Sequence, residues 1–221
     1  MVDRLMEKTG PAVQLESSAR TKGERTREKI LDVAYESIVQ KGFAATSIEE
    51  LVEAAGITKS GFFYHFRDKN DMARQLFDRF LAEDEAIVDM LERRAHELSD
   101  DPLQSFLIFL NLYAQVMDDM QSLHPGCLVA TVTYQERLFD AEVKRMNVEF
   151  LLRMRRRFAG SLAKIAAKYP PRAEVDLDAL ADHLTAIVEG AIVLSKALRD
   201  EGLMGRQTRL FRNHIKLLFG A

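Results

Sequence analysis

The segment from Thr58 to His65 concentrates side chains that could recognise another molecule. Lysine, serine and glycine come first, followed by two phenylalanines, a tyrosine and a histidine. Small and polar residues at the start of a helix let its backbone approach the floor of a DNA groove. Hydroxyl and aromatic groups behind them can meet phosphates and thymine methyl groups. This pattern is typical of a surface that contacts double-stranded DNA.

Two short helices and a turn are expected to position this segment. Ser47 and Glu50 fit a capping box, which starts a helix whose apolar positions recur at i, i+3, i+4 and i+7. Gly56 ends that helix, Ile57 turns inward, and Thr58 caps the next one. This order is that of a helix-turn-helix. The shape alone is often a plain corner between two helices, so it does not decide DNA binding.

More landmarks extend on both sides of the two helices. An apolar first helix is followed by Gly42-Phe43, Thr46-Ser47, Ala55-Gly56-Ile57, Tyr64-His65-Phe66 and Lys69. With these landmarks in this order, the stretch 26–72 resembles the N-terminal domain of TetR-family bacterial regulators. The resemblance implies a three-helix DNA-binding head, a larger helical body for ligand binding and dimerisation, and a palindromic DNA operator as partner.

The resemblance also implies contact roles for individual residues. The start of the second helix would contact the DNA backbone, and the third helix would supply both base and phosphate contacts. Phe63 stands where many members carry tyrosine or another groove-facing residue, so it would make an apolar base contact instead of a hydrogen bond. The predicted DNA-binding residues are Arg25, Thr46, Ser47, Thr58, Lys59, Ser60, Gly61, Phe63, Tyr64, His65 and Lys69.

The distribution of charge fits this assignment better than its sum does. The net charge is −3, which alone argues weakly against a nucleic-acid partner. Basic residues nevertheless outnumber acidic ones between residues 20 and 29, where Arg25 lies. An acidic body with a locally basic head would repel non-specific DNA and still attract phosphate at one surface. The arginines between 153 and 157 are expected to form local ion pairs on a solvated helix face.

Helical spacing extends through nearly all of the chain. The prolines lie between long stretches, and no run alternates with period 2 between hairpin turns, so the fold class is all-α with about nine helices. We expect a mobile arm over 1–22, the helix-turn-helix head over 23–68 and the body over 69–221. The predicted helices cover about 24–40, Ser47 to Gly56, Thr58 to His65, Asp68 to Leu98, Pro102 to Ser122, a short helix ending at Tyr134, Arg137 to Tyr169, Asp176 to Leu198, and Arg206 to Phe219.

The resemblance further implies a homodimer joined by the last two helices of each subunit. The stretch 177–198 supports this, because it is apolar over more than one face. A dimer would hold two recognition helices about 34–36 Å apart, as successive major grooves require. The predicted interface residues are Leu184, Ile187, Ala191, Leu194, Phe211, Ile215 and Leu218.

A small-molecule effector is expected to bind in the middle of the body. Methionines and aromatics at helical spacing are more often plain core, but here they lie where the family keeps its ligand cavity. The predicted pocket residues are Met90, Phe109, Tyr113, Met117, Cys127, Tyr134, Phe150 and Met154.

The favoured function is therefore a cytoplasmic repressor that a small molecule releases from DNA. A narrower alternative makes Cys127 a redox or electrophile sensor, because the start of a helix could favour its thiolate. An alternative of another class is a helical enzyme or carrier. None of the five histidines falls in a recognisable catalytic motif, and histidine and cysteine lack paired metal-ligand spacing. We expect no enzyme activity, cofactor, metal site or membrane span. The effector, the operator and the choice between repression and activation stay open.

Overall fold

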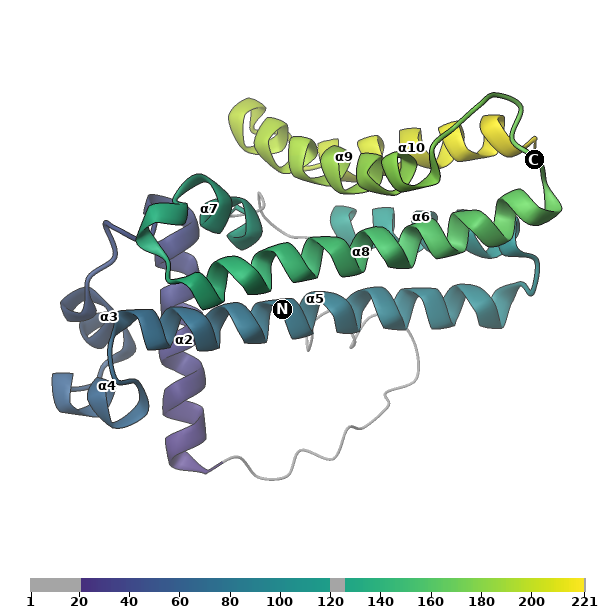
Figure 1. Cartoon of the computed structure of the whole chain (residues 1–221). Helices are drawn as coiled ribbons and strands as arrows, with labels where there is room; N and C mark the ends of the chain where they lie inside the picture. The colour runs from purple at the N-terminus through teal and green to yellow at the C-terminus, as the bar shows by residue number, and fades with distance from the viewer. Residues whose placement is uncertain (1–20, 120–125, 221) are drawn as a thin grey trace. The chain divides into compact units, whose positions relative to one another are not determined.

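The computed structural model describes residues 21–119 and 126–220, and every regular element in these ranges is helical (Figure 1). This confirms the all-α fold class. No helix in the described ranges is long and apolar enough to cross a membrane. The elements are α2 (Lys22–Lys41), α3 (Ile48–Ala55), α4 (Lys59–His65), α5 (Lys69–Leu98), α6 (Pro102–Asp118), α7 (Leu128–Tyr134), the 3-10 helix η1 (Glu136–Leu138), α8 (Ala141–Lys168), α9 (Leu177–Leu198) and α10 (Leu203–Phe219).

Three of these helices start at the aspartates that the sequence predicts as caps. The side chain of Asp101 accepts two backbone N–H groups of the first turn of α6, and Pro102 occupies the first helical position. Asp176 accepts two N–H groups of α9 in the same way. An oxygen of Asp68 accepts the N–H of Asp71 at 2.8 Å at the start of α5. These bonds satisfy N–H groups that have no partner within the helix.

The predicted start of α8 is wrong by four residues. The helix begins at Ala141 and not at Arg137, because Asp140 caps it: an oxygen of Asp140 accepts the N–H of Val143 at 2.9 Å. Residues 136–138 form the separate 3-10 turn η1. The helical periodicity of the sequence continues through this turn, so it could not show the break.

The predicted start of α10 is also wrong, since the helix begins at Leu203 and not at Arg206. Gly205 therefore lies inside the helix and does not separate it from α9. Gly205 is buried where α10 passes α6, and a Cβ atom there would lie 1.9 Å from an oxygen of Asp118. The glycine therefore leaves room for the carboxylate of Asp118, which a Cβ atom would displace.

Two predictions fall partly outside the described residues. Residues 1–20 of the predicted arm lie outside the described residues. The arm's last two residues start α2: Thr21 caps the helix in a capping box with Glu24, and Lys22 is its first residue. The predicted end of α6 near Ser122 also lies outside, while its described part ends at Asp118.

The described residues divide into two compact units. The first comprises residues 21–83 and 126–147, and the second comprises 84–119 and 148–220. The first unit extends beyond the predicted head because α7 and the start of α5 pack with α2. Gln135, just after α7, accepts the N–H of Phe43 at 3.1 Å, and Arg79 of α5 forms an ion pair with Glu28 of α2 at 2.8 Å.

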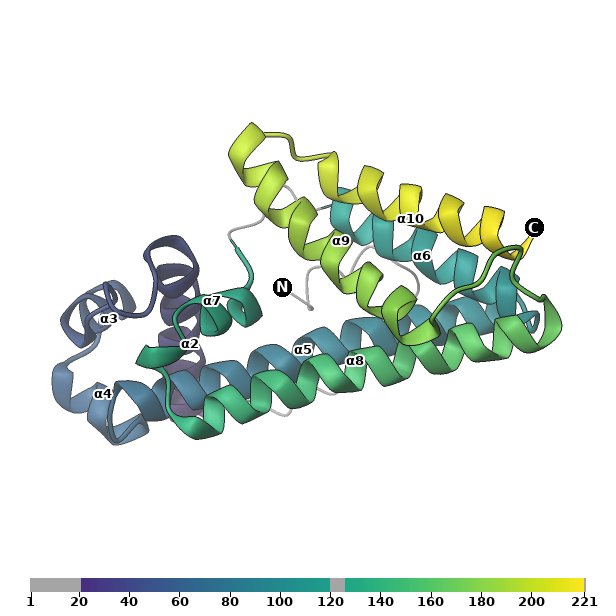
Figure 2. The same ribbon diagram turned by 45° about the horizontal axis from the view of Figure 1, so that its top comes forward.

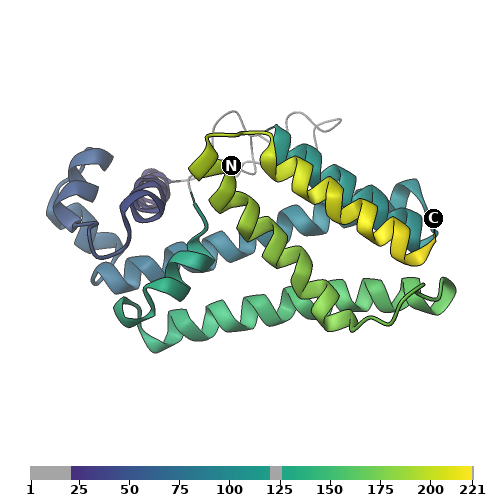
Figure 3. The same cartoon turned by 90° about the horizontal axis from the view of Figure 1, so that it is seen from above.

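In the second unit, α10 packs along α6 and against α9 (Figures 2 and 3). This packing corrects most of the predicted dimer interface. α6 of the same chain covers the apolar face of α10, so most of the predicted residues belong to the core of one protomer. Ile187 is half-buried and Leu194 is exposed. The predicted interface residues that are buried within the chain are Leu184, Ala191, Phe211, Ile215 and Leu218.

Asp84, on α5, is a half-buried carboxyl group of the second unit. Burial, and to a smaller extent the neighbouring charge of Glu85, raises the pKa of Asp84 from 3.8 to about 6. The folded protein therefore holds this proton up to a higher pH than the unfolded chain does. Between about pH 4 and pH 6 the contribution of Asp84 to the free energy of unfolding therefore falls as pH rises. Above about pH 6 the full cost of burying its charge remains.

We predict that Asp84→Asn stabilises the protein at pH 8 by about 1–3 kcal/mol, because the amide keeps the size of the side chain and removes the buried charge. The gain should shrink as pH falls from 6 and vanish below about pH 4. Urea unfolding at pH 8, 6 and 4 measures it. Glu97→Gln is the control, since Glu97 lies elsewhere on α5 in an exposed ion pair with Arg94 and should change stability little. An Asp84→Asn protein no more stable than wild type at pH 8 would contradict the assignment.

Candidate nucleic-acid interface

A tight turn joins α3 to α4 in the first unit. Ser47 and Glu50 form the predicted capping box at the start of α3. At its end, Gly56 adopts a left-handed conformation with φ of +66°, where a residue with a Cβ atom is strained. The N–H of Ile57 then donates to the carbonyl of Val52 at 2.9 Å, which closes the turn.

The second helix of the motif, α4, is capped at one end and buried along one face. The hydroxyl of Thr58 accepts the N–H of Gly61 at 3.1 Å. Phe62 and Phe66 are 0% and 1% exposed, and their ring centroids lie 5.3 Å apart. The predicted role of Thr58 as a cap is confirmed, and the two phenylalanines anchor the inner face of the motif.

The outer face of α4 carries most of the predicted contact residues. Lys59 and Ser60 are exposed, and Phe63 and Tyr64 are 46% and 83% exposed. Large aromatic side chains that are exposed to solvent side by side on one helix indicate a surface that binds a partner. Gly61 is half-buried, so its backbone and not a side chain is available there.

His65 is half-buried at the end of α4. Burial, and then the positive charge of Arg27, lowers its pKa below 6.5. The ring is therefore neutral near pH 7. A neutral imidazole can donate one N–H to a phosphate, but it adds no positive charge to the surface. The predicted phosphate contact at His65 would thus be a hydrogen bond and not an ion pair.

Thr46 is placed differently from the prediction. It is 1% exposed, and its hydroxyl donates to the carbonyl of Gly42 at 3.0 Å and pairs with the hydroxyl of Ser37 at 2.9 Å. Such a side chain cannot reach DNA, so its predicted contact with the backbone is wrong. A threonine next to a capping serine carries no sequence signal for which of the two points inward.

Lys69 also has partners within the chain. Its ammonium donates to the carbonyl of Phe43 and lies 4.1 Å from the centre of that ring. Burial, and then the charge of Lys41, lowers its pKa from 10.5. These contacts fasten the start of α5 to the turn after α2. The remaining two predicted residues are Arg25, exposed on the first turn of α2, and Ser47, half-buried at its cap.

The predicted ligand-pocket residues fall into both compact units. Cys127 and Tyr134 belong to the first unit and the other six to the second. Cys127 is the half-buried residue before α7. Tyr134 is 84% exposed, so the prediction that its side chain lines a pocket is not supported. Phe109, Met117, Phe150 and Met154 are buried, and Met90 and Tyr113 are half-buried.

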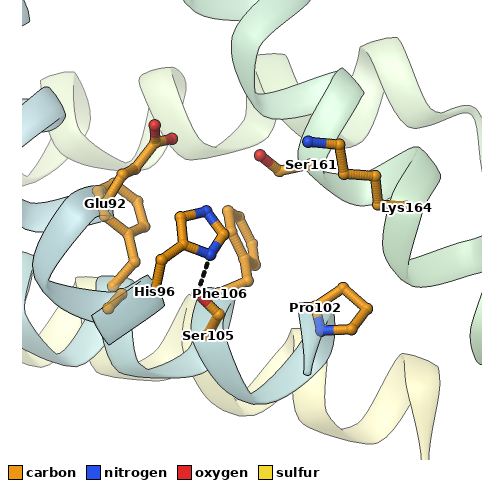
Figure 4. A pocket seen from close by; sticks show the side chains of 9 residues that line it. Glu92, His96, Pro102, Ser105, Phe106, Ser161 and Lys164 are labelled. Carbon is orange, nitrogen blue, oxygen red and sulfur yellow. Dashed lines mark hydrogen bonds between the residues drawn. The ribbon is translucent and has the colours of Figure 1, made fainter. Parts of the chain in front are cut away.

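A different, small cavity lies in the second unit (Figure 4). Its volume is about 30 Å³, far below the roughly 300–1,000 Å³ of typical ligand pockets. Nδ1 of His96 and the hydroxyl of Ser105 form a hydrogen bond of 3.1 Å on its wall. Of the predicted pocket residues it includes only Phe109. The lining residues are Glu92, Ala95, His96, Pro102, Ser105, Phe106, Phe109, Ser161 and Lys164.

The capped turn, the buried inner face of α4 and its exposed outer face together define a helix-turn-helix DNA-binding protein. Comparison with known proteins agrees. Residues 30–76, from α2 into α5, match the family model described as "Bacterial regulatory proteins, tetR family". The chain therefore carries the DNA-binding domain of the TetR family of bacterial transcriptional regulators.

Individual relatives extend this match. The chain is 36% identical over 59 residues to the HTH-type transcriptional regulator AcrR of Shigella flexneri, a match covering 27% of each chain. It is 24% identical over 187 residues to the transcriptional regulator AcuR of Cereibacter sphaeroides, covering 85% of this chain and 84% of that one. The fold matches the crystal structure of a TetR-family regulator from Agrobacterium tumefaciens with a TM-score of 0.72 at 21% identity, covering 87% and 98% of the two chains.

The turn geometry makes a prediction about two glycines. Gly56→Ala should destabilise the protein by about 1–2 kcal/mol, because alanine must adopt the left-handed conformation although its Cβ has space. Gly160→Ala, inside α8 where a Cβ meets no neighbour, should stabilise it by about 0.5–1 kcal/mol. Urea unfolding measures both changes. Equal effects at the two positions would contradict the role given to Gly56.

Proposed function

We propose that this regulator is a homodimeric repressor that binds a palindromic operator and is released by a small molecule. The observation that carries the DNA-binding part is the exposed outer face of α4, held in place by its buried phenylalanines. The match to the TetR family supports the dimer and the effector. The regulator relatives favour this function over a helical enzyme or carrier.

The DNA surface that we propose differs from the sequence-based set in three ways. Thr46 is removed because it is buried, and His65 contributes a hydrogen bond without charge. Lys69 acts first by holding α5 to Phe43. The base-reading and phosphate-binding residues are then Arg25, Ser47, Thr58, Lys59, Ser60, Gly61, Phe63 and Tyr64, with the neutral ring of His65.

We assign the dimer interface to the residues of α9 and α10 that the chain itself leaves exposed. Val193, Leu194 and Leu198 lie on α9, and Leu210 and Leu217 on α10; each is between 47% and 69% exposed. Large exposed apolar side chains on two packed helices are typical of an interface. In a two-fold dimer both subunits contribute the same surface. A contact between α9 and α10 of the two subunits would therefore bury these five side chains on each subunit.

Tight, salt-sensitive binding to DNA is the first expected outcome. Fluorescence anisotropy on tiled duplexes from the gene's own upstream region should find one palindromic tile bound strongly, with affinity falling steeply as salt rises. Lys59→Ala and Tyr64→Ala should each weaken this binding by roughly 5- to 100-fold, the cost of one lost contact. The control Arg94→Ala removes an exposed cation of the second unit and should change little. Absence of binding to any tile at low salt by a dimeric protein would contradict the proposal.

Self-association should depend on the exposed leucines. Leu194→Arg with Leu210→Arg should weaken the dimer on the order of 100-fold, because charges would be buried without partners. Sedimentation equilibrium measures this directly. Val148→Arg is the control, since Val148 is 55% exposed on α8 but lies outside the assigned surface. A double variant that stays dimeric would place the interface elsewhere.

A further inference from the structure

An ion pair connects the two helices of the helix-turn-helix on its exposed side. Lys59 Nζ lies 2.7 Å from an oxygen of Glu49, and their side chains are 60% and 67% exposed. Glu49 belongs to the first turn of α3, and Lys59 is the first residue of α4. The sequence-based prediction includes Lys59 as a DNA contact but omits Glu49. Glu49 has no basic residue three or four positions away, so the sequence contains no helical ion-pair signal for it.

Stability does not explain this pair. Exposed ion pairs contribute at most about 1 kcal/mol. The capping box of α3 uses the neighbouring Glu50, which also pairs with Lys41 at 2.5 Å. Glu49 is therefore an additional carboxylate on the side of the motif that carries the DNA contacts. The hydrogen bond from Lys59 lowers its pKa, so it is charged at neutral pH. A carboxylate at this place that bound neither a cation nor a base would repel the DNA phosphates.

The chemistry of the pair matches one base pair better than the others. In the major groove, guanine presents two acceptors, N7 and O6, and the paired cytosine presents the N4 amino donor beside them. A lysine ammonium donates to the guanine acceptors, and a carboxylate accepts from cytosine N4. Adenine places its N6 donor next to N7, so the ammonium would meet only one acceptor there. The salt bridge already holds donor and acceptor side by side.

We propose that Glu49 and Lys59 act as one unit that reads a G·C base pair in each operator half-site. Lys59 contacts guanine, and Glu49 contacts cytosine N4 while it holds the ammonium in position. Glu49 is thus a specificity-determining residue. This inference rests on the proposed DNA-binding function, but it adds a residue and a base preference to it.

The test is a selection of bound duplexes from a randomised pool, with sequencing of the enriched motif. The proteins compared are wild type, Glu49→Gln, Lys59→Gln and the control Glu53→Gln, which removes an exposed charge one turn farther along α3. Wild type should enrich a palindrome with a G·C pair at a fixed place in each half. Both pair variants should lose the preference at that same position only, and the control should keep the full motif.

Anisotropy on the enriched duplex gives the magnitude. Exchanging the G·C pair for A·T should weaken wild-type binding roughly tenfold, the usual cost of one specific base contact, and should not affect Glu49→Gln. An unchanged motif for Glu49→Gln overturns the inference while DNA binding stands. Tighter binding of that variant to all sequences with an unchanged motif also overturns it, because Glu49 would then only repel phosphate. No enriched motif for wild type overturns the proposed function itself.

Discussion

Burial of Phe62 and Phe66 is the constraint on which the DNA-binding surface depends. α4 has seven residues, too few for a stable helix in isolation, so packing and not helix propensity must hold it. Each buried phenylalanine contributes about 1.5–3 kcal/mol of hydrophobic stabilisation. Because both lie on one face a single turn apart, they also fix the rotation of the helix. The exposure of Phe63 and Tyr64 follows directly, since these residues occupy the opposite face.

Charge pairing explains how an acidic protein can present a DNA-binding surface. The arginine-rich part of α8 does not form a second basic patch: Arg153 pairs with Glu85 at 2.7 Å, Arg155 with Asp182 at 2.6 Å, and Arg157 with Asp89 and Glu92 at 2.5 Å. The predicted local ion pairs are confirmed for these three arginines. Neutralised arginines in the second unit offer little attraction to phosphate. The exposed cation of α4 is instead paired with an acid that can itself accept a hydrogen bond from a base.

Local signals predicted most of the fold. Ser47, Gly56, Asp101 and Asp176 act through bonds within four residues of themselves, so their effect can be inferred from a short window of sequence. The start of α8 at Asp140 escaped prediction because an apolar period continued through the 3-10 turn. The family landmarks led to the proposed DNA-binding face, while the buried surroundings of His65 and Thr46 could not be predicted. Their environment depends on residues of α2 and of the turn after it.

The sequence by itself determined that these helices form, most of their caps and the helix-turn-helix, because hydrophobic periodicity and capping act over a few residues. Only the tertiary structure decided which apolar helix faces are covered by other helices of the same chain. Phe211 and Ile215 have the pattern expected of an interface, yet they are buried within the chain, and Leu210 and Leu217 remain exposed. It also decided that Glu49 lies beside Lys59, ten residues away. Periodicity shows that a face must be buried, but the partner that buries it is set by packing between elements distant in sequence.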